Sequence, residues 1–378
     1  MSTDSSKSTY AQLSKPFFTS QEIELIMKNN IDLTQNIRNF NSKKKDTFQL
    51  LISLIIKLKF PLRVLQNSSY LYQKFYLLNN NYKKYSNLQF EVGLTVLFIS
   101  LKLNDYIKKI SVVISEGFSL KGSHLSSSDI EENKKIIISL ERKILEFQSF
   151  DFRNFLIEDF LVKYLKYFNE IDINNIKLEQ EREKEQEQEQ EQEQEQEQEK
   201  QKQKENKTSF SYLCWSILND LYLTSLVLQY PAHYNAMISI NCAIIIYNEL
   251  INHKDIINKD EIPIDWNFKN LLNKDQDDSF LILGCNQLLE YYIDNINITF
   301  VKNCLSELNF KIEEKKLVDL LLNIKIDINN KLPSNPTIYK INENDMFFQP
   351  RDTDIAKNGS LRFLYNKKKF TDEIKLYK

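Results

Sequence analysis

Glycine is almost absent from this chain, with five residues among 378. Tight hairpins, β-barrels and phosphate-binding loops consume glycine, because only glycine adopts left-handed backbone conformations without a steric cost. Leucine, isoleucine, lysine, glutamate, glutamine and asparagine dominate instead, and hydrophobic residues make up 42% of the chain, enough for a sizeable core. The composition therefore predicts an all-α protein and disfavours all-β and nucleotide-binding folds.

Apolar periodicity and capping signals predict the individual helices. The capping signal Thr19-Ser-Gln-Glu22 precedes a short N-terminal helix. Two runs, Leu88–Leu103 and Pro231–Leu250, are apolar on nearly all sides, which is typical of a helix enclosed by others. Further helices are expected at about 45–58, 62–78, 106–115, 128–148, 152–169, 209–227, 266–272, 279–292 and 313–328. We therefore expect two helical bundles in series, each around one of the two apolar helices.

A run of alternating glutamate and glutamine interrupts this pattern at residues 178–207. It has no apolar face and cannot offset its ordering entropy, so we interpret it as a disordered insert. Because each doubling of loop length costs only about 0.6 kcal/mol, the folded domain can continue beyond the insert. The expected organisation is a flexible N-terminus over 1–20, a first domain over 21–152, a second domain over 153–300 that contains the insert, and a C-terminal helix and irregular tail over 301–378.

Residues suited to catalysis, metal binding or phosphate binding are few and lie far apart in the sequence. The pattern Gly117-x4-Gly122 lacks the lysine of a phosphate-binding loop. The three histidines, His124, His233 and His253, are not in metal-binding spacings. The four cysteines form no C-x-x-C pair and lie among apolar residues: Cys214, Cys242, Cys285 and Cys304. We therefore expect buried thiols, no metal, no cofactor and no enzymatic activity of the chain itself.

The charge balance and hydropathy also limit the partners. Fifty basic and 52 acidic residues give a net charge of −2, whereas nucleic-acid binding usually needs a basic domain. No uncharged apolar run reaches the roughly 18 residues of a membrane span, and the N-terminus has no apolar signal segment. We therefore expect no membrane association, no secretion and no direct nucleic-acid contact.

Several stretches, in this order along the chain, resemble the cyclin family. They are LKFPLRVLQNSSYLYQKFYLL (58–78), VGLTVLFISLKLNDYIKKISVVI (92–114), LERKILEFQSFDF (140–152) and YLCWSILNDLYLTSLVLQYPAHYNAMISINCAIII (212–246). The last is similar to the second repeat of cyclins of types K, T and C. The segments LSKPFFTSQEIE, IRNFNSKKKDTFQLLISLIIKLKFP and SFDFRNF are similar to the beta (cyclin) subunits of the kinases that phosphorylate the C-terminal domain of RNA polymerase II. The resemblance covers about residues 13–295 and implies two tandem cyclin-fold five-helix bundles.

The resemblance also implies a kinase-binding surface on the third and fifth helices of the first repeat. Lys102 and Glu141 match the lysine and glutamate with which the family contacts its kinase, and Asp105 matches a second acidic position. Asn104 departs from the family by replacing its first acidic residue. The matching apolar contact positions are Leu103, Leu145 and Phe150. Without the resemblance, Lys102 can equally be interpreted as a solvated charge at a helix end, and Glu141 as part of a solvated helix face.

The function that this resemblance implies is regulatory. The chain would bind and activate a cyclin-dependent kinase that phosphorylates the polymerase C-terminal domain, with or without a third subunit, in the nucleus and in support of transcription elongation. The alternatives are another transcriptional cyclin of type K, T, C or L, a non-cyclin helical scaffold, or a DNA-binding general transcription factor of the IIB type.

Overall fold

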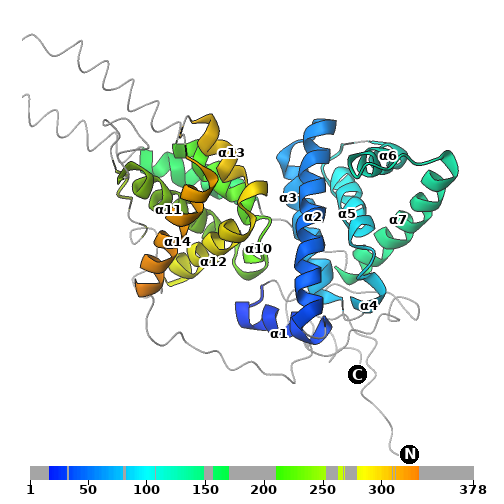
Figure 1. Ribbon diagram of the computed structural model, residues 1–378, viewed down its shortest axis with the longest axis horizontal. Helices are drawn as coiled ribbons and strands as arrows, with labels where there is room; N and C mark the ends of the chain where they lie inside the picture. Colours follow the sequence, from blue (N-terminus) through cyan, green and yellow to red (C-terminus); the bar gives the residue numbers. More distant parts are fainter. Residues whose placement is uncertain are drawn as a thin grey trace, which may run out of the picture. The chain divides into compact units, whose positions relative to one another are not determined.

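The computed structural model describes residues 17–31, 34–79, 82–106, 108–148, 156–169, 210–252, 263–266, 268, 279–308, 310 and 312–331. Within these ranges all regular structure is helical, which confirms the all-α prediction (Figure 1). The described residues form two compact units, one before and one after the division between Asn154 and Phe155. The glutamate and glutamine insert, His253 and Phe150 lie outside the described residues.

The first unit contains a capped N-terminal helix and a bundle. Its helices are α1 (Ser20–Asn30), α2 (Thr34–Leu58), α3 (Leu62–Leu78), α4 (Tyr82–Tyr85), α5 (Gln89–Leu103), α6 (Ile110–Leu120) and α7 (Ser127–Phe147). The capping box predicted for α1 is present, because the Thr19 hydroxyl accepts from the backbone N–H of Glu22 and the Glu22 carboxylate accepts from that of Thr19.

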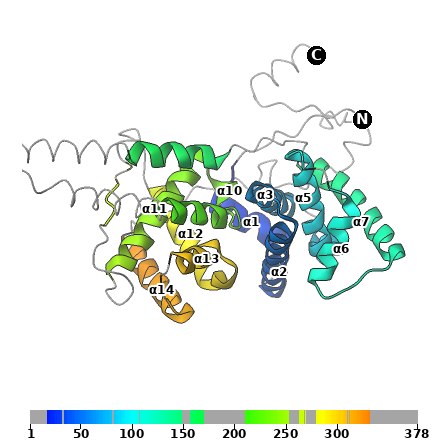
Figure 2. The same cartoon turned by 90° about the horizontal axis from the view of Figure 1, so that it is seen from above.

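Helix α5 is the centre of this bundle, as its apolar sequence predicts. It contacts α2, α3, α6 and α7, and Figures 1 and 2 show it between these helices. Close approach depends on small residues: a Cβ at Gly93 would overlap the methyl group of Thr47 on α2, and one at Gly117 of α6 would lie 2.8 Å from a methyl group of Leu94. The core therefore lies on all sides of α5, and only its C-terminal end reaches solvent.

Several helix boundaries differ from the sequence expectations. Helix α2 begins eleven residues before the predicted start at 45, and α6 covers 110–120 rather than 106–115. Helix α6 starts late because the chain turns at 104–106 before Lys109 provides its N-cap. It also extends past the predicted end at 115 and includes Gly117. Helix α7 begins at Ser127, one residue before the predicted start, and Ser126 and Asp129 form its capping box.

The second unit is a bundle around α11. Its helices cover 157–169 and 210–221, followed by α10 (Leu226–Gln229), α11 (Ala232–Asn252), α12 (Ser279–Asn295), the 3-10 turn η2 (Ile296–Ile298), α13 (Phe300–Glu307) and α14 (Glu314–Lys331). Helix α11 is buried along most of its length and contacts α10, α12 and α14. The predicted helix at 209–227 is interrupted after residue 221, where the Thr224 hydroxyl bonds the Leu221 carbonyl and the Leu226 N–H.

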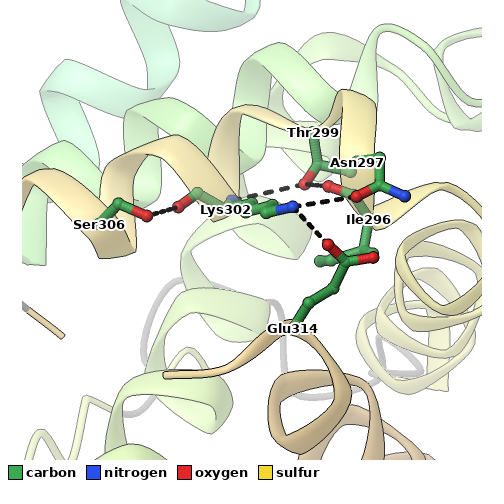
Figure 3. A network of polar contacts seen from close by, with 6 residues as sticks. All are labelled: Ile296, Asn297, Thr299, Lys302, Ser306 and Glu314. Atoms are coloured by element: carbon green, nitrogen blue, oxygen red, sulfur yellow. Dashed lines mark hydrogen bonds and ion pairs between the residues drawn. The ribbon is translucent and has the colours of Figure 1, made fainter. Parts of the chain in front are cut away.

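Helix α13 was not expected from the sequence, and long-range contacts hold it. The buried carboxyl group of Asp220 accepts hydrogen bonds from the backbone N–H groups of Phe300 (2.8 Å) and Val301 (3.0 Å). Figure 3 shows that Lys302 then joins α13 to its neighbours, with its ammonium 2.6 Å from Glu314 of α14 and 2.9 Å from the side-chain oxygen of Asn297. Helix α14 itself packs on α12 and α11, so the helices after residue 300 belong to the second compact unit.

The cysteines of the second unit are buried, and its residue His233 packs against aromatic rings. Cys214, Cys242, Cys285 and Cys304 are buried free thiols, which confirms the expectation of burial. His233 lies in the first turn of α11 against the rings of neighbouring aromatic residues, 5.9 Å from Phe160 and 4.4 Å from Tyr234 between ring centroids. Burial lowers the pKa of His233. None of the described helices has the length and apolarity needed to cross a membrane.

Candidate functional site

Lys102 and Glu141 meet on the surface of the first unit. The Lys102 ammonium donates a hydrogen bond to a Glu141 carboxylate oxygen at 2.6 Å, joining the last turn of α5 to the middle of α7. The lysine side chain is 52% exposed and the glutamate side chain 15%. The glutamate is thus largely covered by protein while the lysine faces solvent. Partial burial of the carboxylate reduces solvent screening of this pair relative to a fully exposed surface ion pair.

Apolar groups surround this ion pair. The Lys102 ammonium lies 4.3 Å from the ring centroid of Phe98, one turn earlier on α5, in a cation–π contact. Leu103 follows directly and is 38% exposed. Leu145, one turn after Glu141 on the same face of α7, is half-buried. Each of the two helices therefore carries apolar side chains close in sequence to the charged residue that it contributes to the pair.

The turn after α5 explains the departure from the family pattern at Asn104. The Asn104 side-chain amide donates to the Ser100 carbonyl at 2.8 Å, closing the end of the helix. An ionised carboxylate has no proton to donate, so an acidic residue could not make this bond. Asp105 follows with φ of 59°, in the left-handed region, and its side chain is exposed.

A second charge cluster stabilises the end of α7. The Glu146 carboxylate accepts hydrogen bonds from the Arg142 Nε at 2.9 Å and from the Lys143 ammonium at 2.8 Å. Burial raises the pKa of Glu146, but the bonds from Lys143 and Arg142 outweigh it and leave the pKa below its ordinary value. The pKa of Tyr85 is raised by burial and by the negative charge of Glu146. Glu146 is therefore ionised at neutral pH, and its two bonds stabilise the last turns of α7 from within the helix.

The arrangement suits recognition rather than catalysis. Around Lys102 and Glu141 the structure presents a paired charge and apolar side chains on rigid helices, which is how protein interfaces combine orientation with affinity. In the described part of the chain, no group of three or more His, Cys, Asp or Glu side chains is arranged to hold a metal ion.

Most of the site residues predicted from the sequence come together. Lys102 of α5 and Glu141 of α7 pair directly, Leu103 follows Lys102 in the chain, Leu145 lies one turn after Glu141, and Asp105 lies in the turn after α5. Phe150 lies outside the described residues. The sequence reasoning did not select Phe98, although its position one turn before Lys102 was a signal for the cation–π contact. Whether these residues bind a kinase stays a prediction.

Comparison with known proteins first defines the class. No protein-family model matches the chain. Its fold is similar to the crystal structure of the yeast RNA polymerase II CTD kinase CTDK-1 complex, with a TM-score of 0.66 at 19% identity over 96% of this chain and 98% of that one. The protein is thus an all-α protein with the cyclin fold, as the resemblance implied.

The curated relatives are more specific. The chain is 32% identical over 154 residues to the CTD kinase subunit beta of Saccharomyces cerevisiae, covering 40% of this chain and 46% of that protein. It is 25% identical over 240 residues to the CTD kinase subunit beta of Schizosaccharomyces pombe, covering 61% and 58%. The matches span about half the length of these relatives. They confirm the predicted similarity to the beta subunits of CTD kinases.

Proposed function

We propose that this chain is a regulatory cyclin subunit that binds and activates a cyclin-dependent kinase acting on the C-terminal domain of RNA polymerase II. The observation that carries the proposal is the Lys102–Glu141 pair at 2.6 Å, flanked by Leu103 and Leu145, on a cyclin fold whose relatives are CTD kinase beta subunits. In this role the chain has no catalytic residues of its own.

The physical mechanism is a shift of population. A kinase of this class is active when a glutamate of its αC helix pairs with the lysine of strand β3 and its activation loop is open. A rigid partner favours that state only by binding it more tightly than the inactive one. Leu103 and Leu145 supply apolar contact, and Lys102 and Glu141 fix the orientation of the bound helix.

The test is a reversal of the ion pair. In Lys102→Glu with Glu141→Lys, the two side chains still pair with each other, so the fold is retained while the surface charges exchange places. The expected result is loss of co-purification with the kinase and loss of phosphorylation of polymerase repeat peptides. Unchanged binding by this variant would show that the pair is not the interface.

The second unit offers a matched control. Lys302 and Glu314 are also 2.6 Å apart, and Asn297 can rotate its amide to bond either charge. Lys302→Glu with Glu314→Lys should therefore leave kinase binding intact. If no kinase co-purifies with the unmodified chain, the proposed function itself is wrong.

The same co-purification separates the other candidates. The identity of the recovered kinase distinguishes a CTD kinase subunit from cyclins of types K, T, C and L, and a third protein in equal amount would be a third subunit. Nuclear localisation and a role in transcription elongation are part of the proposal. Microscopy of a fluorescent fusion and nascent-transcript profiles after depletion of the chain test them.

A further inference from the structure

The chain is almost neutral overall, but its charges are unevenly distributed. Residues 1–154, which precede the division between the units, hold 22 lysines and arginines and 14 aspartates and glutamates, a net charge of +8. Residues 155–338 hold 19 basic and 32 acidic residues, a net charge of −13. Charge asymmetry of this kind points to an anionic partner for the basic part of the chain.

Two lysines of the first unit lie at the turn that joins α4 to α5. The ammonium of Lys43, from α2, donates hydrogen bonds to the backbone carbonyl of Ser86 at 3.2 Å and to the side-chain oxygen of Asn87 at 3.3 Å. Lys84 of α4 is exposed and precedes Ser86 by two residues, and its ammonium lies 5.6 Å from the ring centroid of Tyr85. Both ammonium groups therefore adjoin the short segment 84–87.

A third lysine, Lys44, follows Lys43 in the chain and reaches α3. Its ammonium donates a hydrogen bond to the side-chain oxygen of Gln73 at 3.0 Å and lies 5.2 Å from the ring centroid of Phe48. Burial lowers the pKa of Lys44 to about 8, and no carboxylate counteracts this effect. We name the surface formed by Lys43, Lys44 and Lys84 the basic corner.

The basic corner differs from other cations of the first unit in what it contacts. Lys57, Lys102 and Lys143 each lie within 2.6–2.8 Å of a carboxylate oxygen. Within the described part of the chain, the three ammonium groups of the basic corner contact neutral oxygen atoms and aromatic rings instead. Their positive charge is therefore not neutralised by an ion pair there.

Two carboxylates belong to the surroundings of the basic corner, and neither cancels its charge. Asp46 lies on α2, two residues after Lys44, and is exposed to solvent. The negative charge of Glu146 raises the pKa of Tyr85, but this carboxylate is already bonded by two cations of α7. The basic corner thus keeps an excess of positive charge that a bound anion would neutralise.

The chemistry of the basic corner favours a phosphorylated peptide over a carboxylate ligand or a nucleic acid. Lysine binds phosphate as a point charge, whereas bidentate recognition of carboxylates uses the planar fork of arginine. Single-stranded nucleic acids are bound through exposed aromatic faces on which their bases stack. Here the rings of Phe48 and Tyr85 are only 1% and 5% exposed, so they offer no such face.

We propose that the basic corner binds a peptide that carries several phosphoserines, which is the product class of the kinase reaction proposed above. Each phosphoserine carries a charge of about −1.5 to −2 at pH 7, and this charge complements the three ammonium groups. A product held in this way stays near the bound kinase at a high effective concentration, which favours phosphorylation of further serines in the same peptide. The inference rests on the proposed function for the choice of peptide, and it uses none of the residues assigned to kinase binding.

The test measures peptide binding by the full chain alone, without a kinase, through fluorescence anisotropy. The probe is a labelled polymerase repeat peptide with several phosphoserines, and it is compared with the same peptide without phosphate. The phosphorylated peptide should bind about tenfold more tightly or better, and its Kd should rise with salt concentration because the contact is electrostatic. Equal Kd values for the two peptides would overturn the proposal.

Charge reversal locates the binding surface. Lys43→Glu with Lys84→Glu should raise the Kd of the phosphorylated peptide about tenfold or more, whereas Lys43→Arg with Lys84→Arg keeps both charges and should change it less than about twofold. The control is Lys315→Glu with Lys316→Glu, which reverses two exposed charges of α14 in the second unit and should leave the Kd unchanged. A wild-type Kd in the first variant would overturn the basic corner.

A single substitution covers the case in which the double reversal does not fold, which thermal unfolding detects. Lys84→Glu changes an exposed side chain that contacts only a ring, and it should raise the Kd about threefold or more. A single-stranded RNA of equal charge is the competing ligand. If the RNA binds more tightly than the phosphorylated peptide, the surface recognises nucleic acid and the proposal is wrong.

The outcomes distinguish this inference from the proposed function. Lys43→Glu with Lys84→Glu should still co-purify with the kinase, because these side chains lie outside the kinase-binding site. Recovery of a kinase by a chain that does not bind the phosphorylated peptide would overturn the basic corner and leave the proposed function standing. Peptide binding by a chain that recovers no kinase would overturn the proposed function and leave the basic corner as a phosphopeptide site.

Discussion

The ammonium of Lys102 and the carboxylate of Glu141 lie 2.6 Å apart although 39 residues separate them in the chain. Helix α6 and the loop after it lie between them in sequence, and the pair forms because α5 and α7 pack against each other. The site is thus a product of bundle packing, and it depends on the stability of the contact between these two helices.

Removing one partner of this pair should destabilise the first unit. In Lys102→Ala, a carboxylate that is only 15% exposed loses its counter-charge, and we expect a cost of about 1–2 kcal/mol in the free energy of unfolding. Urea denaturation measures it. Lys134→Ala is the control, because its partner Glu131 is 63% exposed at 3.3 Å and little change is expected. Equal losses in the two variants would contradict a special role for partial burial.

Gly284 should not tolerate a side chain. A Cβ at this position of α12 would lie 2.6 Å from Cδ1 of Ile238 on α11 and 2.8 Å from its Cγ1 and Cγ2. Gly284→Ala should therefore destabilise the second unit by about 1–3 kcal/mol, despite the better helix propensity of alanine. The check is a double-mutant cycle with Ile238→Ala, which makes room for the new methyl group. The prediction requires a smaller cost of Gly284→Ala in the Ile238→Ala background, and additive costs would refute it.

Asp220 should make the second unit less stable as the pH rises. Burial raises the pKa of Asp220 to about 8, against the bonds from the N–H groups of Phe300 and Val301, which lower it. An unfolded aspartate titrates near about 3.9, so the folded unit holds this proton more tightly. The stabilisation is complete below about pH 4 and is lost as the pH rises towards 8.

The measurement compares the unmodified chain with Asp220→Asn, which does not titrate. Urea unfolding of both at pH 5 and pH 8 should show that the free energy of unfolding falls by about 1 kcal/mol or more in the unmodified chain relative to the variant. If the free energy of unfolding depends on pH in the same way in both proteins, the prediction is wrong, and the two backbone N–H donors keep the Asp220 carboxylate ionised.

At residues with a left-handed backbone, such as Gly122 and Lys59, replacing glycine and introducing glycine should have opposite effects on the free energy of unfolding. Gly122→Ala places a side chain at φ of 77° and should cost about 1 kcal/mol. Lys59→Gly should raise the free energy of unfolding by about 0.5–1 kcal/mol, because relief of strain exceeds the added entropy of the unfolded chain. Chemical denaturation of the two variants tests this, and a loss of stability in Lys59→Gly would show that its side chain holds the turn.

Much of the helical framework could be predicted from the chain because its causes are local. Thr19 and Glu22 form the predicted capping box, and α3 has the predicted bounds Leu62–Leu78 after Pro61. The apolar sequences of α5 and α11 identified the two central helices. Helix α13 was missed because its start is held by Asp220, 80 residues earlier in the chain, and no local pattern reports such a bond.

The candidate site also has some features that the sequence predicts and others that only helix packing decides. The sequence by itself determined the all-α class and the two bundles, and through the cyclin resemblance it predicted a kinase-binding site at Lys102, Leu103, Asp105, Glu141, Leu145 and Phe150. Only the tertiary structure decided that Lys102 pairs with Glu141 over the ring of Phe98, and that the ends of α2 and α5 meet through Phe60 and Tyr106. The physical reason is that helix formation depends on neighbours within about four residues, whereas these contacts depend on how distant helices pack.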